Sequence, residues 1–293
     1  MPENQNIQNK KLPLKFFIWE VFLFSITLFL GIATAFQIKG VLKTEEISVA
    51  PVTFWQVVYS FIIGTLFVLA VVFLIKSKSK KGKIFKILFI FTIFWGGLVT
   101  LDVWLGSIFY LSGEIFALFL IIFLIYLWFK EHSVLIHNIC LILGIIGACA
   151  TLGLRIEPFT MLLLLAIFSV YDFIAVYKTK HMVKMATEMI ESKAILGFVI
   201  PQQASGFKGD LKELKIGGPN LILGGGDIAF PLLFCTSLLN QSLLFSLIVA
   251  VFSIIGLFFS FLIFKFQKER KAIPALPPIA LFCILGYLIT LII

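Results

Sequence analysis

The sequence predicts an all-α, polytopic membrane protein whose helices cross the bilayer nine times. Of its 293 residues, 60% are hydrophobic and 13% are charged, which is more apolar than a globular core requires. The apolar residues are gathered into runs of about 20, the length that a helix needs to cross the hydrocarbon of a membrane. The basic residues are divided very unequally between the loops that alternate along the chain.

Nine apolar runs define the predicted spans. They cover residues 16–36, 53–75, 84–101, 107–129, 134–154, 158–177, 221–239, 242–264 and 272–293. The first run follows three lysines and could be taken for a signal peptide. At about 20 residues it is longer than the apolar region of 7 to 15 residues typical of signal peptides, so we interpret it as an uncleaved first span.

The distribution of Lys and Arg predicts the orientation of the chain. When the spans are counted in order, only Lys39, Lys43 and Arg155 of the 24 basic residues fall on the side opposite the N-terminus. Because basic loops remain in the cytoplasm, this places the N-terminus inside. With nine spans, the C-terminus then faces outside.

Composition and motifs argue against several classes of function. The net charge is +9, but the lysines lie in short runs between apolar segments, so no nucleic-acid partner is expected. No His-Glu-x-x-His motif of zinc proteases occurs, and no serine lies at matched depth with a histidine. The cysteines lie in apolar runs without CxxC spacing, so we expect no disulfide, metal or cofactor; they are Cys140, Cys149, Cys235 and Cys283.

The one long connection, residues 178–220, joins spans six and seven on the inner side and is a candidate gate. Within it, residues 181–193 place Met182, Met185 and Met189 at helical spacing opposite charged side chains, which predicts a short helix on the membrane surface. The alternative is a solvated helix without a specific role.

Two spans carry one acid each, Asp172 in span six and Asp227 in span seven. A charged side chain at the centre of a spanning helix costs about 2.5 to 3.5 kcal/mol on insertion scales, so two of them indicate a function. Asp172 lies six residues before Lys178, and Asp227 lies six residues after Leu221. At a rise of 1.5 Å per residue, both acids are predicted about 9 Å from the inner ends of consecutive helices.

Two carboxyl groups at one level cannot both ionise cheaply, so such a pair tends to share one proton. This is the state that an aspartic protease uses, in which the charged acid activates water and the neutral acid donates to the carbonyl oxygen. Three other acids, Glu20, Asp102 and Glu114, are expected to have interfacial or structural roles near span ends.

Two irregular stretches are predicted near the level of the acids. Gly224, Gly225 and Gly226 weaken helical order just before Asp227, and Pro274-Ala275-Leu276-Pro277-Pro278 removes N–H donors at the start of span nine. Non-helical backbone at membrane depth is tolerated only inside protein or beside a watery cavity. Both stretches are therefore expected to face one cavity.

These residues carry a resemblance to a known family. Tyr171-Asp172, Gly224-x-Gly226-Asp227 and Pro274-Ala275-Leu276, in this order, resemble the three signatures of the presenilin and signal peptide peptidase family of intramembrane aspartyl proteases. The resemblance implies that Asp172 and Asp227 are the catalytic pair and that the other residues of the three motifs shape the site or help to dock the substrate.

The same resemblance implies transmembrane helical proteins in the lipid bilayer as substrates, and it identifies no partner subunit. With its cytoplasmic N-terminus and compact loops, the chain looks most like the archaeal presenilin homologues, which implies a multi-pass protein of a prokaryotic cell membrane. Within a single transmembrane domain, residues 1–157 would be the scaffold and residues 158–293 the catalytic part. Loop 178–220 is shorter than the corresponding loop of presenilin, and this departure puts in doubt the self-cleavage known for presenilin.

Two alternatives remain open at this point. A proton- or cation-coupled secondary transporter could use the same two acids beside helices broken by glycine, and it would move charge without forming peptide products. A prepilin-type peptidase has a similar glycine and aspartate motif, but it would be expected to have fewer spans and no Pro274-Ala275-Leu276 segment.

Overall fold

The computed structural model describes residues 14–46, 52–74, 78–109, 112–178, 189–190, 195–211, 214, 220–267 and 272–293. The long helices are α1 (Leu14–Thr44), α2 (Phe54–Leu74), α3 (Lys78–Phe109), α4 (Gly113–Glu131), α5 (Val134–Gly153), α6 (Pro158–Tyr177), α8 (Gly225–Leu238), α9 (Leu243–Lys265) and α10 (Leu276–Thr290). Between α6 and α8 lie the strands β1 (Gly197–Pro201) and β2 (Asn220–Gly224) and the 3₁₀ helix η2 (Ala204–Lys208). The surface helix predicted at residues 181–193 falls outside the described residues, apart from positions 189 and 190.

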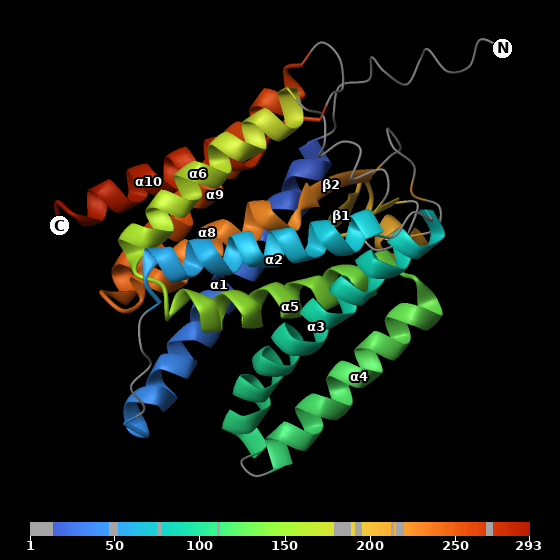
Figure 1. Ribbon diagram of the computed structural model, residues 1–293, viewed down its shortest axis with the longest axis horizontal. Coiled ribbons are helices and arrows are strands. Elements are labelled where there is room, and N and C mark those ends of the chain that lie inside the picture. The colour runs from blue at the N-terminus through green and yellow to red at the C-terminus, as the bar shows by residue number, and fades with distance from the viewer. Residues whose placement is uncertain are drawn as a thin grey trace.

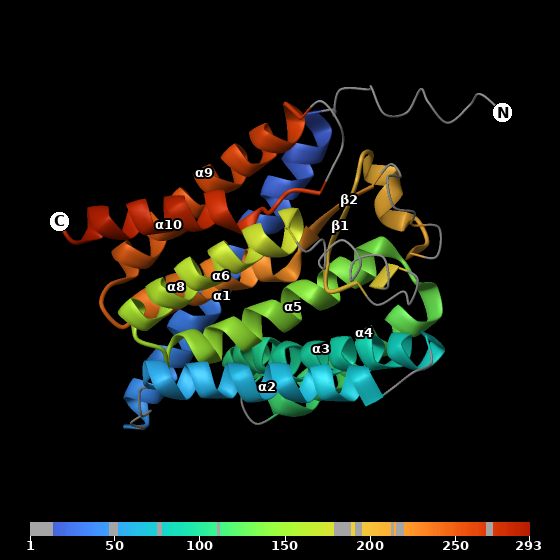
Figure 2. The same cartoon turned by 45° about the horizontal axis from the view of Figure 1, so that its top comes forward.

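The helices form a bundle with three parts. Helices α6, α9 and α10 lie along one side, and α3 and α4 lie along the other (Figure 1). Between them pass α1, α5 and α8, which pack against one another. The two strands lie at one end of the bundle, beside the start of α5 (Figure 2).

Six of the described helices are long and apolar enough to cross a membrane: α1, α3, α4, α5, α6 and α9. Three shorter apolar helices accompany them, in α2, α8 and α10. Each predicted apolar run thus corresponds to a helix, and the mostly helical membrane architecture agrees with the prediction.

Small residues hold α5 close to α3. A Cβ atom added at Gly147 would overlap the carbonyl group of Gly96, so the two backbones approach more closely than any larger side chain allows. The hydroxyl of Thr100 donates to the carbonyl oxygen of Leu143 at 2.8 Å across the same contact. Helix α5 is therefore a fixed support for the elements that pack on its other face.

The all-α prediction is wrong at one place, because β1 and β2 form an antiparallel sheet. Gly197 pairs with Gly224 and Pro201 with Asn220. The predicted span 221–239 therefore divides into a strand up to Gly224 and a helix from Gly225. The physical reason is the glycine triplet, which weakens a helix, together with the partner strand, which takes up the hydrogen bonds of the preceding segment.

Candidate active site

Asp172 lies near the C-terminal end of α6 and meets the N-terminus of α10. Its side chain is 4% exposed, and its Oδ2 accepts the backbone N–H of Leu276 at 3.3 Å. The first N–H groups of a helix have no partner within the helix and attract negative charge. Pro277 and Pro278 have no N–H, so Leu276 supplies the first donor at this end.

The Pro274-Ala275-Leu276 segment thus has a definite geometric role. Pro274 is buried, Ala275 is the N-cap residue of α10, and the side chain of Leu276 is 3% exposed. The segment before α10 has no helical structure at residues 272–274, as the prolines predict. Its tight packing holds the Leu276 N–H toward Asp172.

Asp227 is the third residue of α8, not a residue 9 Å inside a helix as we predicted. Gly224 is the N-cap residue, with an extended ψ of 140°, and its backbone interacts with the Asp227 carboxyl group. A Cβ atom at Gly224 would lie 2.9 Å from Oδ2 of Asp227, closer than real Cβ contacts. The absence of a side chain at Gly224 therefore leaves space for the carboxyl group of Asp227.

Gly225 has a different reason to be glycine. Its N–H donates to the carbonyl oxygen of Leu196 at 2.9 Å, and an added Cβ would lie 2.9 Å from that oxygen. Gly226 is exposed, and the nearest atom to an added Cβ is a ring carbon of Phe230 at 3.6 Å. The backbone beside Asp227 is therefore open to another chain at Gly226.

The structure places the two acids close enough to interact electrostatically. One helical turn away from them, the rings of Phe168 on α6 and Phe230 on α8 stack with centroids 4.4 Å apart. This stack holds α6 against α8 at the level next to the acids. Tyr171, next to Asp172 on α6, has a side chain that is 55% exposed.

A third acid, Glu20 on α1, belongs to this site. Its side chain is 5% exposed, its Oε2 has no hydrogen-bond partner among the described residues, and its charge interacts with Asp227. An interfacial or structural role was expected for Glu20, and its burial beside Asp227 favours a place within the protein over one at the membrane interface. The available signal was its depth, because Glu20 lies six residues after Leu14 and so about 9 Å into α1.

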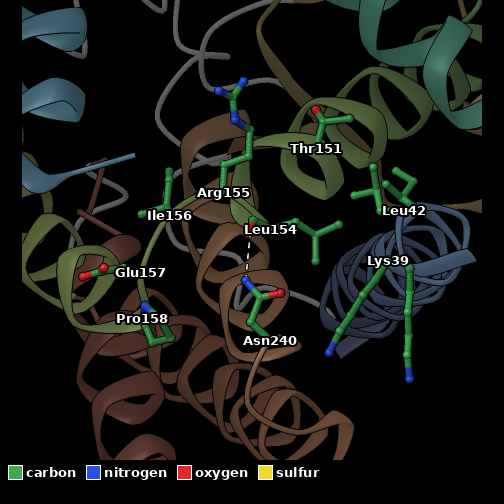
Figure 3. A pocket seen from close by; sticks show the side chains of 11 residues that line it. Lys39, Leu42, Thr151, Leu154, Arg155, Ile156, Glu157, Pro158 and Asn240 are labelled. Carbon is green, nitrogen blue, oxygen red and sulfur yellow. Dashed lines mark hydrogen bonds between the residues drawn. The ribbon is translucent and has the colours of Figure 1, made fainter. Parts of the chain in front are cut away.

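Nothing among the described residues resembles a metal centre, since no group of three or more His, Cys, Asp or Glu side chains could hold an ion. A cavity of about 690 Å³ lies elsewhere, between the end of α1, the α5–α6 connection and Asn240 (Figure 3). Lys39, Lys43 and Arg155 line it, and the guanidinium of Arg155 points away from the side chain of Lys39. This cavity contains neither of the two aspartates.

Comparison with known proteins identifies the family of this chain. The family model described as signal-peptide peptidase, presenilin aspartyl protease matches residues 19–293. No curated protein sequence is similar enough to match. Two solved structures of a presenilin family intramembrane aspartate protease, in P2 and C222 space groups, share 20% and 18% sequence identity with this chain.

The likeness extends over nearly the whole fold. The two solved structures cover 92% and 93% of this chain and 96% of their own chains, with TM-scores of 0.59 and 0.61. The family model spans the whole helical bundle from α1 to the C-terminus. The chain therefore belongs to the signal-peptide peptidase and presenilin family of intramembrane aspartyl proteases.

Proposed function

We propose that this protein hydrolyses peptide bonds within transmembrane segments of other membrane proteins, with Asp172 and Asp227 as its catalytic pair. The observation that carries the proposal is the electrostatic interaction between these two carboxyl groups, one on α6 and one on α8, with Asp172 also bound by the first N–H of α10. Two carboxyl groups this close share one proton. The charged member takes a proton from the attacking water, and the neutral member donates to the carbonyl oxygen of the substrate.

The hydrogen bond from α10 supports a division of roles within the pair. The Leu276 N–H donates to Asp172, and a hydrogen bond to a carboxylate favours its charged form. Asp227 has Asp172 as a neighbouring acid, and the charge of one acid opposes ionisation of the other. We assign Asp172 as the base that activates water and Asp227 as the acid.

The register of the sheet supports a docking edge for the substrate. The bond from Gly225 N–H to Leu196 makes Gly197 and Gly224 a non-hydrogen-bonded pair, so the backbone groups of Ile222 and Gly224 point away from β1. The side chain of Ile222 is 36% exposed. An unwound substrate could add to this edge of β2, which no other described strand pairs with and which leads directly into Asp227.

The topology that we propose has nine spans, with a cytoplasmic N-terminus and the C-terminus outside. The six long helices would span the membrane together with α2, α8 and α10. Lys39, Lys43 and Arg155, the three basic residues predicted outside, line one cavity, which supports a common side for them. An archaeal cell membrane and transmembrane helical substrates complete the proposal.

The transporter alternative gains no support from the family to which the chain belongs. The deciding experiment incubates the purified protein in detergent with a model single-span substrate and sequences the fragments. We expect cuts inside the apolar segment, and none with the Asp172→Ala variant. Intact substrate after long incubation with the wild type would contradict the proposed function.

A further inference from the structure

Side chains of α5 hydrogen-bond the backbone groups of β1 that face away from β2. Because Gly197 and Val199 both belong to non-hydrogen-bonded pairs with β2, their backbone groups point away from β2. In an ordinary two-stranded sheet these groups would form a second open edge, ready to pair with another strand.

Asn138 closes the middle of this edge with two hydrogen bonds. Its Nδ2 donates to the carbonyl oxygen of Val199 at 2.8 Å, and its Oδ1 accepts the Val199 N–H at 3.0 Å. One side-chain amide thus takes both backbone groups of Val199, as a peptide group of a third strand would. Asn138 is 1% exposed and Val199 is 0% exposed, so water does not compete for these bonds.

His137 closes the neighbouring position. Its Nδ1 faces the indole N–H of Trp128 at 3.3 Å and therefore acts as the acceptor, so the hydrogen is on Nε2. This Nε2 donates to the carbonyl oxygen of Gly197 at 3.1 Å. The ring of Phe89 stacks on His137 with centroids 4.9 Å apart and an interplanar angle of 6°, which fixes the imidazole plane.

The end of β1 completes the contrast between the two edges. Pro201 has no N–H, so it offers no donor for a further strand. All five residues of β1 are buried, whereas Ile222 on β2 is exposed. In the described part of the chain, the edge beside Asp227 is open and the opposite edge is closed.

We propose that Asn138 and His137 are positioning residues that restrict strand addition to β2 and hold the sheet in register with Asp227. This inference rests on the proposed function, in which an unwound substrate pairs with the sheet. Neighbouring strands lie about 4.8 Å apart, so a substrate on the β1 edge would lie about 10 Å from β2 and on its far side. Closing that edge prevents binding out of reach of the aspartates.

The test uses Asn138→Leu, which keeps the size of the side chain and removes both hydrogen bonds. We expect the KM for a membrane-spanning substrate to rise on the order of tenfold, because the docking edge loses its fixed position. The kcat for a short, already extended peptide should change less than about twofold. The matched control is Ser133→Ala, which removes a bond from the same end of α5 to the carbonyl of Phe207, off the sheet edge.

A merely structural role would lower the cleavage of both substrates in proportion to the folded fraction, and that result would overturn the inference. If Asn138→Leu does not fold, Asn138→Ser leaves a hydroxyl group that is too short to bind both backbone groups of Val199. This variant should also raise the KM for the membrane-spanning substrate more than it changes the kcat for the short peptide, but by a smaller factor. Equal losses with this variant would also overturn the inference.

Hydrogen exchange keeps the test separate from the proposed function. In Asn138→Leu the Val199 amide should exchange faster, while the Leu223 amide, which belongs to the β1–β2 ladder, should stay protected. Unchanged protection of Val199 would refute the closed edge even if the wild type cleaves. A wild type that cleaves neither substrate would refute the function and leave the exchange result to decide the edge.

Discussion

A proline at Ile222 tests strand docking with the least disturbance of the fold. The register directs the Ile222 N–H to the open edge of β2, whereas the neighbouring Leu221 pairs with Ile200 in the ladder. Ile222→Pro therefore removes one donor from the docking edge and leaves the β1–β2 bonds in place. A helix in lipid hides its carbonyls, so a substrate that unwinds depends on such donors.

The size of the effect follows from the one hydrogen bond that is lost. A carbonyl left unsatisfied away from water costs about 1 to 3 kcal/mol, which corresponds to a loss of about 5- to 150-fold in kcat/KM for the membrane-spanning substrate. A short, extended peptide does not have to unwind. Its kcat/KM should therefore fall by less than about fivefold, which corresponds to the net contribution of one hydrogen bond exchanged with water.

The assay measures kcat/KM for both substrates in detergent, with fragments quantified by mass spectrometry. Ile222→Ala is the matched control, because it shortens the side chain and keeps the N–H. Leu221→Pro should instead disturb the ladder and lower the cleavage of both substrates. If Ile222→Pro and Ile222→Ala behaved alike, or if Ile222→Pro weakened both substrates equally, the docking argument would be refuted.

Three further predictions concern the acids. Asp172→Ala and Asp227→Ala should each abolish cleavage while the melting temperature stays near that of the wild type, since neither change removes apolar packing; near-normal turnover in either variant would refute the paired mechanism. The rate of the wild type should follow a bell-shaped pH profile, falling where both aspartates are protonated and again where both are ionised, and a flat profile from acidic to neutral pH would count against a shared proton. Glu20→Gln and Asp227→Asn, combined in a double-mutant cycle of thermal stability, should show a coupling of about 0.5 to 3 kcal/mol. The reason is that either substitution alone already removes the repulsion between the two acids. Gln37→Met on the same helix is the control, since Gln37 also has a buried oxygen that no described residue hydrogen-bonds, and it should be additive with Asp227→Asn.

Glu20 illustrates how far local sequence patterns reach. Its position near the N-terminal end of an apolar run is compatible with an interfacial acid as well as with a buried one, and its depth of about 9 Å in α1 is the sign of the second case. The difference arises from the packing of α1 on α8, which turns Glu20 toward Asp227. Contacts between helices far apart in the chain leave no periodic signal in either helix.

The sequence by itself determined the class of the protein and its candidate chemistry. Runs of about 20 apolar residues predict spans because a helix must satisfy its own backbone in lipid, and an acid inside such a run is too costly to be incidental. Asp172, Asp227 and the segment around Pro274 were found in this way. Each of these signals is local, so it can be read from consecutive residues.

Only the tertiary structure decided where the chain leaves the helix and which edge of the sheet stays open. The run before Gly225 is apolar enough for a helix, yet it pairs as β2 with a strand that ends 19 positions earlier in the chain. Asn138 meets Val199 across 61 residues, and Leu276 meets Asp172 across 104. Hydrogen bonds of this range depend on how the helices pack, and therefore neither the closed edge nor the donor to Asp172 can be derived from the order of the residues.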